Sequence, residues 1–379
     1  MQWRSWYVVV AVCSVASVLL SADKRINQAP EVPSSPAKNR WECFADFLWW
    51  QGDVEGTEVV ASGPLTLLSD SSGYNCDFDI SAPTGTWEPG MRLGAGYQFE
   101  QYDAWKVEAF WTFIFTASDG VDLSTAGSNR RILPLGPNPL GPNAAQYHAQ
   151  WWLRSNLADV QLGREFFPTT HLALKPHLGV RGGFFQFKLH HSALGQWSAL
   201  NSSMQGPPTT MYNPTWDRNQ FQYNGIGFRI GNDTAWHIAN HWTIMGNIAG
   251  SLLYGKYNNR ESFLGYTPNA ENDGGPALIR ATGVNTLSSW NVRTNVELYL
   301  GICWDRCWGK QKHIALSAGY ELAAWFLLNN LYSLIDGNQI FFAWNGATEL
   351  YFSDSYFTGI AANSNITYQG LTARVALDF

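Results

Sequence analysis

The chain has 379 residues, of which 14% are charged, 45% hydrophobic and 15% aromatic, including 19 tryptophans. Soluble domains carry about 25% charged residues, and disordered chains are rich in charge and poor in aromatics, so the composition disfavours both classes. Acidic residues outnumber basic ones 30 to 24, which argues against nucleic-acid binding. Beyond the N-terminus no apolar run approaches the roughly 18 residues of a membrane-spanning helix. This combination is typical of a transmembrane β-barrel.

The N-terminus has the layout of a secretory signal peptide. Arg4 precedes an apolar stretch over 6–20, and small residues follow it. We therefore assign residues 1–22 to the signal peptide; earlier cleavage, or a lipidated cysteine within the apolar stretch, are alternatives. Residues 23–40 are polar and contain prolines, which predicts a periplasmic linker. The barrel itself is expected over 41–379.

Alternating apolar and polar residues predict the strands, because side chains along a barrel strand point in turn to lipid and to the lumen. Residues 89–100 and 105–113 alternate on either side of a three-residue turn and predict a hairpin. Residues 290–300 and 314–322 predict a second one. The pattern gives about ten strands, in a range of 10 to 16: 41–51, 89–100, 105–113, 145–162, 171–188, 220–231, 235–254, 290–300, 314–322 and 366–379.

The predicted strand 145–162 changes character halfway along. Up to Leu157, its apolar residues are expected to face lipid: Tyr147, Trp151 and Leu153. Beyond Leu157, polar residues such as Asp159 occupy the odd-numbered positions, which are apolar earlier in the strand. A β-bulge would explain this change. In the next predicted strand, 171–188, Pro176 has no backbone N–H, so one hydrogen bond to a neighbouring strand is lost.

The predicted connections alternate in length. The short ones are 101–103, 163–170, 231–235 and 302–311, and the long ones are 52–88, 117–144, 189–219, 255–284 and 327–365. Outer-membrane barrels have short periplasmic turns and long extracellular loops. The sequence therefore predicts an all-β, antiparallel, up-and-down barrel in the outer membrane of a Gram-negative bacterium. A secreted soluble β-protein is the alternative, but the predicted lipid faces carry no charged residue.

Four stretches are similar to a known family: WECFADFLWWQGDVEGTE at 41–58, WEPGMRLGAGYQFEQYDAWKVEAFWTF at 87–113, LADVQLGREFFPTTHLALKPHLGVRGGFFQ at 157–186 and YQGLTARVALDF at 368–379. They resemble the Legionella-type major outer membrane proteins and the porin-like outer membrane proteins of environmental chlamydiae. The resemblance implies an outer-membrane barrel with porin-like behaviour and no catalytic residues. The terminal Phe379 looks like the signal that the outer-membrane assembly machinery recognises.

The polar faces of the predicted strands supply candidate channel-lining residues of both signs: Arg92, Lys106, Glu108, Arg154, Lys175, Arg181, Asn291, Arg293, Glu297, Glu321 and Arg374. A wall of mixed sign favours weak ion selectivity, so the expected function is passive diffusion of small hydrophilic solutes. Alternatively, the charges pair across the interior, and a plugged barrel serves as a structural or adhesive surface protein. About eight strands leave room only for side chains, whereas 16–18 leave an aqueous channel.

No enzymatic activity, metal or cofactor is expected, because the sequence holds no phosphate-binding loop, nucleophile elbow or HExxH motif. An outer-membrane protease is a less favoured alternative. His190 and His191 are the only candidates for it, and the sequence offers them no obvious acidic partner.

Cysteines are expected to pair in an oxidising compartment. Cys303 and Cys307 lie in one predicted periplasmic turn and form the candidate disulfide. The resemblance to chlamydial envelope proteins raises intermolecular disulfides as an alternative. The expected partners are outer-membrane lipid, the assembly machinery and further copies of the chain, for example in a trimer, and no nucleic acid.

Overall fold

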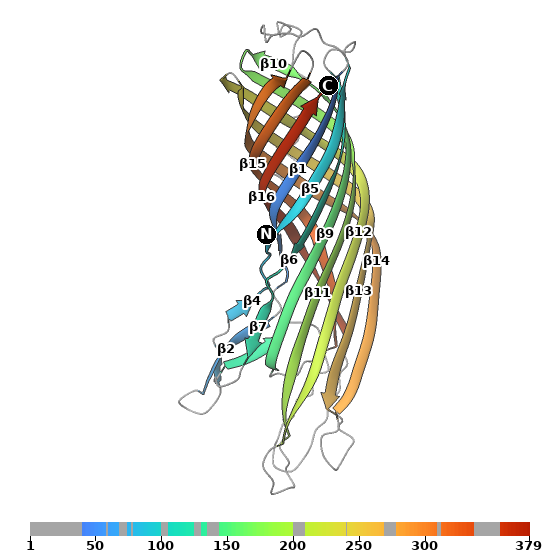
Figure 1. The fold of residues 1–379 in the computed structure, drawn as a ribbon. Helices are drawn as coiled ribbons and strands as arrows, with labels where there is room; N and C mark the ends of the chain where they lie inside the picture. Colours follow the sequence, from blue (N-terminus) through green and yellow to red (C-terminus); the bar gives the residue numbers. More distant parts are fainter. Residues whose placement is uncertain are drawn as a thin grey trace.

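The fold is a closed antiparallel barrel (Figure 1), seen in a computed structural model. The structure describes residues 40–57, 60–67, 74–76, 79–99, 105–124, 130–134, 144–199, 209–239, 241–268, 278–308, 312–336 and 357–379. The signal peptide and nearly all of the predicted linker lie outside these residues. Within them, no helix is long and apolar enough to cross a membrane.

Ten strands form the ring, which confirms the predicted fold class and strand number. In ring order they are β1 (Arg40–Val54), β5 (Trp87–Gln98), β6 (Trp105–Ala117), β9 (Ala144–Arg164), β11 (Leu172–Ala199), β12 (Thr209–Ala239), β13 (Trp242–Pro268), β14 (Leu278–Trp308), β15 (Lys312–Asp336) and β16 (Phe357–Asp378). The pairing of β16 with β1, the last and the first strand of the ring, closes the barrel. There, Trp41 and Phe379 each donate a backbone N–H to the other's carbonyl oxygen, at 3.0 and 2.9 Å.

Within the described part of the chain, six short strands lie outside the ring. A four-stranded sheet consists of β2 (Val60–Leu67), β3 (Tyr74–Cys76), β4 (Asp79–Ser81) and β8 (Arg130–Pro134). The other two, β7 (Val121–Ser124) and β10 (Phe166–Thr169), pair with β9 and β11. In Figure 1, β2, β4 and β7 lie beside the barrel towards its long-loop end.

The strands β11 to β14 are much longer than a membrane requires. They contain 28, 31, 27 and 31 residues, whereas about 9–11 residues cross a bilayer. A strand of 31 residues is about 100 Å long. Much of the predicted loops 189–219 and 255–284 is therefore strand (Figure 1). Because these strands are longer than a membrane span, the barrel continues beyond the membrane at its long-loop end.

Two predicted turns are misplaced. Residues 231–235 lie inside β12 and pair with β11 on one side and β13 on the other. The chain reverses after Ala239 instead, where His241 has a φ of 75°. Likewise, β14 continues to Trp308, so most of the predicted turn 302–311 is strand. Pairing on both sides outweighs the local turn preference of a polar, glycine-containing segment.

The β-bulge predicted near Leu157 is absent, because β9 keeps one register with β6 from Trp105↔Arg164 to Ala117↔Trp152. Side chains on β9 alternate between the two faces throughout its pairing with β6. What changes along the strand is which face carries the apolar residues. The apolar residues before Leu157 are buried inside the barrel and do not face lipid, contrary to the prediction: Tyr147, Trp151 and Leu153. Arg154 is exposed on the outer surface.

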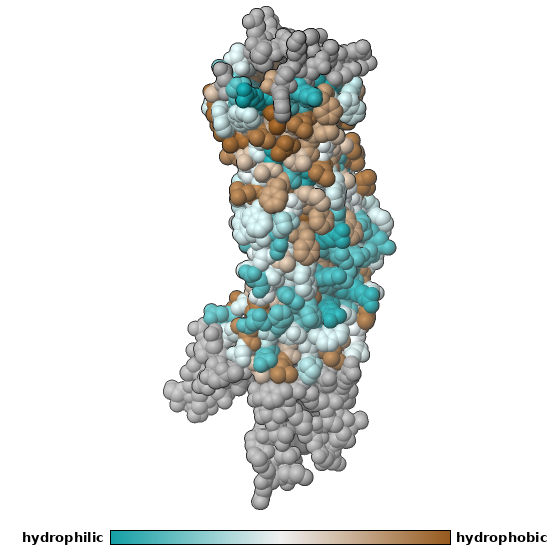
Figure 2. All heavy atoms as spheres, viewed as in Figure 1, coloured by the Kyte–Doolittle hydropathy of each residue, from teal (hydrophilic) through white to brown (hydrophobic). Residues whose placement is uncertain are grey.

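Other ring strands show the same change: apolar side chains lie on the outer face near the short turns and on the inner face nearer the long loops. The apolar residues nearer the short turns are exposed: Trp49, Val160, Val180, Ile226, Tyr254, Tyr320 and Leu371. A few positions further along the same strands, the apolar residues are buried: Trp50, Leu157, Phe185, Tyr223, Tyr257, Trp325 and Tyr368. Figure 2 shows brown residues gathered towards the short-turn end and teal residues over much of the surface nearer the long loops. This change therefore marks the outer edge of the lipid-facing belt.

Pro176 is accommodated where β11 changes partner. On one side β11 pairs with β9 from His177 onward and with β10 up to Leu174. Pro176 lies in the interval between these two ladders, so its missing N–H costs little on this side.

Candidate functional site

The lumen holds a charged layer and, towards the long loops, an aromatic plug. We define the plug by nine inward side chains that are at most 2% exposed: Trp50, Trp151, Phe185, Phe187, Phe221, Tyr223, Tyr257, Trp325 and Tyr368. The charged layer comprises the ion-paired inward residues between the plug and the short turns. Together these two parts determine whether a solute can pass.

Arg181 is the centre of the first group in the charged layer. Its Nε donates to Asp159 Oδ1 at 2.6 Å, and its Nη1 donates to Asn295 Oδ1 at 2.9 Å and also binds Glu297. From β12, Arg229 Nη2 reaches the same Glu297 at 2.8 Å. Four strands, β9, β11, β12 and β14, are thus tied together across the interior.

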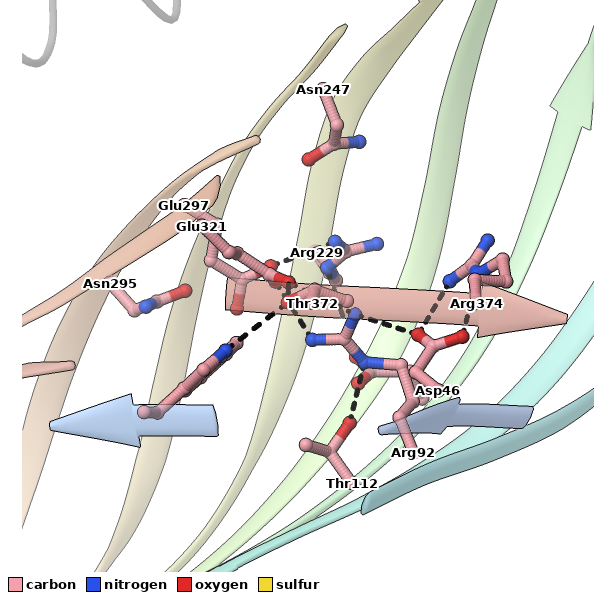
Figure 3. A network of polar contacts seen from close by, with 12 residues as sticks. Asp46, Arg92, Thr112, Arg229, Asn247, Asn295, Glu297, Glu321, Thr372 and Arg374 are labelled. Carbon is pink, nitrogen blue, oxygen red and sulfur yellow. Dashed lines mark hydrogen bonds and ion pairs between the residues drawn. The ribbon is translucent and has the colours of Figure 1, made fainter. Parts of the chain in front are cut away.

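Arg92 is the centre of the second group (Figure 3). Its Nη2 lies 2.8 Å from Glu321 Oε1, and its Nη1 lies 3.2 Å from Asp46 Oδ2. Arg374 Nε donates to the other oxygen of Asp46 at 2.7 Å. The Nε of Arg92 donates to Thr112 Oγ1 at 3.0 Å. Each carboxylate here faces a guanidinium, which offsets part of the cost of burying charge.

Lysines form the third group, nearer the short turns. Lys106 pairs with Glu42 and lies 2.7 Å from Glu108. Lys175 Nζ lies 2.9 Å from Glu108 and 2.9 Å from Asp233. Glu108 therefore bridges two ammonium groups, and the wall of the lumen carries charges that neutralise one another.

The structure brings eight of the eleven candidate lining residues together in these groups: Arg92, Lys106, Glu108, Lys175, Arg181, Glu297, Glu321 and Arg374. Asn291 and Arg293 belong to the inward face of β14 at the level of the plug, where the Arg293 guanidinium lies 5.8 Å from the centre of the Tyr257 ring. Arg154 does not line the lumen. Sequence alternation assigned it wrongly because its part of β9 lies outside the lipid belt.

A cavity of about 440 Å³ lies within the charged layer, a volume typical of small-molecule sites. Arg92, Lys175 and Glu108 are among its lining residues. Trp50, Trp325 and Tyr368 of the plug also line it. The polar cavity therefore ends against aromatic rings on its long-loop side.

Aromatic rings pack across the plug. Phe221 stacks on Phe187 and on Tyr257, with ring centres 5.3 and 5.2 Å apart, and Phe185 meets Trp325 edge-on at 4.6 Å. These distances fall within the favourable 4.5–7 Å range for aromatic pairs. The polar atoms of the plug are also satisfied in places, since the Trp50 indole donates to Thr372 at 3.1 Å and the Tyr223 hydroxyl to the Leu253 carbonyl at 2.9 Å.

A buried histidine–aspartate pair lies beyond the plug, towards the long loops. His191 Nε2 is 3.2 Å from Asp217 Oδ2, and the two side chains are 3% and 0% exposed. Sequence analysis missed this partner because the register that places His191 opposite Asp217 links β11 to β12. His190 lies on the opposite, outward face of β11. Among the described residues, no group of three or more His, Cys, Asp or Glu side chains is placed to hold a metal ion.

The predicted disulfide between Cys303 and Cys307 is not formed. Both cysteines are free, and both lie in β14 because this strand runs past the predicted turn. Four residues of extended strand separate their Cα atoms by about 13 Å, whereas a disulfide needs less than about 7 Å. Cys43 is also free and is exposed.

We expect the two thiols of β14 to differ in reactivity. Cys307 is exposed and Cys303 is buried, so a polar maleimide should label Cys307 at least tenfold faster in the folded barrel. Because the exposed Cys43 also reacts, the rates are followed separately on the peptides that contain Cys303 and Cys307 by mass spectrometry, and labelling in denaturant should remove the difference. Equal rates in the folded barrel would place Cys303 at the surface.

One family model and several solved structures match this chain. A family model described as the Legionella pneumophila major outer membrane protein precursor matches residues 32–379. The Escherichia coli outer membrane protease OmpT is 9% identical, with a TM-score of 0.31, over 91% of this chain and 97% of that chain. The Pseudomonas putida toluene transporter TodX is 11% identical, with a TM-score of 0.29, over 94% and 93%. Likeness at this level carries no functional argument, and no curated protein matches the sequence.

Proposed function

This chain belongs to the Legionella pneumophila major outer membrane protein family, and from that premise we propose that it is a closed barrel with a structural and adhesive role at the bacterial surface. The observation that carries the proposal is the aromatic plug. From β9 to β15, the centres of its neighbouring rings lie 4.6 to 6.1 Å apart, and dry apolar constrictions block ions and polar solutes.

The charged layer also supports a closed barrel. Some of its ion pairs join neighbouring strands, such as Arg92–Asp46 and Arg181–Asp159. Arg92–Glu321 and Arg181–Glu297 join strands that are three positions apart in the ring, so these two pairs reach across part of the interior. In an open pore these charges would stand free in a water-filled channel. The long strands beyond the lipid belt present an extended surface for contacts outside the cell.

The second candidate is a passive diffusion channel for small hydrophilic solutes with weak ion selectivity. The 440 Å³ cavity and its wall of mixed sign favour it. Passage by this route requires the plug side chains to move, because the cavity ends against them.

The proposal includes no enzymatic activity. The His191–Asp217 pair is the strongest candidate for chemistry, but its side chains are almost fully buried, so a peptide substrate has no access to it. We also propose Phe379 as the assembly signal, and lipid and the assembly machinery as partners. A trimer and intermolecular disulfides remain predictions.

Reconstitution into a planar bilayer tests the proposal. We expect no stepwise conductance from the folded protein, because the plug leaves no continuous aqueous path. Folding is verified on the same sample by the altered gel mobility that unheated barrels show in detergent. Reproducible conductance steps would overturn the proposal in favour of the diffusion channel.

A further inference from the structure

The outer surface just beyond the lipid belt carries a basic panel. On β9 and β11 to β14, its outward positions are the even-numbered residues of 150–156, 184–190, 218–224, 256–262 and 284–290. Five of these positions are exposed basic residues: Arg154, Lys188, Arg218, Lys256 and Arg260. None of the panel positions is acidic, although acidic residues outnumber basic ones in the whole chain.

The strand registers bring four of these cations close together. Lys188 pairs with Trp152 on β9 and with Gln220 on β12, and Gln220 pairs with Arg260 on β13. Arg154, Lys188, Arg218 and Arg260 are thus successive diagonal neighbours, and diagonal neighbours lie about 7–8 Å apart. Like charges at this spacing repel one another unless an anion lies between them.

No described residue supplies that anion. None of the five cations forms an ion pair within the described part of the chain; instead Arg154 lies over the Phe113 ring at 5.3 Å and Arg218 over the Trp216 ring at 5.1 Å. Rings beneath a guanidinium orient it and leave its N–H donors free for a ligand. The panel therefore lacks its counter-charge.

The other side chains of the panel indicate what the anion is attached to. Most are amides or aromatic rings: Gln150, Asn156, Gln186, Gln220, Gln222, Asn224, Asn258, Trp152, Phe184 and Trp290. Amides both donate and accept hydrogen bonds, as recognition of sugar hydroxyls requires, while arginine and lysine bind phosphate.

The position of the panel selects a lipid as the source of the phosphate. Tyr254 and Trp290 stack at 5.4 Å and are both exposed at the edge of the lipid belt, where aromatic girdles meet headgroups. The panel begins at this level, since Trp290 lies in the same cross-strand row as Lys256. Its cations therefore lie at and beyond headgroup height.

We propose that the basic panel binds the phosphates and sugars of an anionic glycolipid of the outer leaflet. This inference rests on the proposed orientation, in which the long strands extend away from the cell. It does not depend on whether the barrel conducts.

Vesicles test the proposal. The barrel is reconstituted into phosphatidylcholine containing a few per cent of a bis-phosphorylated, acylated glucosamine disaccharide, re-extracted in uncharged detergent, and the retained glycolipid is quantified. The variant Arg154→Gln/Lys188→Gln/Arg260→Gln should retain at least tenfold less than the wild type. The matched control Arg306→Gln/Lys312→Gln removes exposed basic residues at the short-turn end and should retain as much as the wild type.

Further vesicles distinguish the source of the charge. Dephosphorylated glycolipid and phosphatidylglycerol should each be retained at least tenfold less than the bis-phosphorylated glycolipid, and inorganic phosphate should not displace it. Equal retention by the panel variant, or equal retention of phosphatidylglycerol, would overturn the proposal. Conductance of the same samples is measured separately, so a channel could be found while the panel still binds glycolipid.

Discussion

Truncating the aromatic plug is expected to turn a silent barrel into a conducting one. Phe221 lies between Phe187 and Tyr257 and is fully buried. The double variant Phe187→Ala/Phe221→Ala removes two fully buried, stacked rings from the plug, and we expect water and small ions to enter the space. The readout is stepwise conductance in planar bilayers, at a frequency at least ten times that of the wild type.

A matched control lies on the same strand. Phe228 is 69% exposed on the lipid face of β12, so Phe228→Ala should leave the barrel silent. Each buried Phe→Ala change costs about 3–5 kcal/mol in compact proteins, and only samples with the gel mobility of folded barrel are therefore compared. A folded plug variant that stays silent would show that the charged layer itself closes the lumen.

Replacing Arg181 is expected to cause the largest loss of stability. Its guanidinium is buried and binds both Asp159 and Glu297. Arg181→Met keeps much of the side-chain volume but leaves Asp159 and Glu297 undercompensated, which typically costs about 3–5 kcal/mol. The measurement is the free energy of unfolding in urea for barrels in lipid vesicles, followed by tryptophan fluorescence.

Two variants show whether the loss comes from unpaired charge. Lys188→Met changes an exposed cation on the same strand and should shift the free energy of unfolding by no more than about 0.5 kcal/mol. Adding Asp159→Asn to Arg181→Met should restore more than half of the loss, because Arg229 still neutralises Glu297. No recovery in the double variant would assign the loss to packing.

Much of the fold could be predicted because alternation with a period of two is a strong signal. All ten ring strands overlap the predicted segments, and the hairpin around 101–103 joins the expected pair, β5 and β6. The central part of the site could also be predicted. Alternation alone placed Arg92, Arg181 and Glu297 on the lumen side, and all three form ion pairs there.

The errors share one physical cause. Alternation shows that a strand has two different faces, and it does not show which medium each face meets. On β9 the apolar face is outside at Val160 and inside at Trp151, because the strand leaves the lipid between them. Arg154 and the supposed bulge at Leu157 were misinterpreted for this reason.

The sequence by itself determined an antiparallel, all-β membrane barrel of about ten strands, because the period-two pattern and low charge are local properties of the chain. Only the tertiary structure decided how far the strands extend, which residues oppose one another and what fills the lumen. The His191–Asp217 pair, the ion pairs of Arg181 and the stacking of Phe221 each join different strands. Register between strands arises from the closure of the whole ring, so no single segment encodes it.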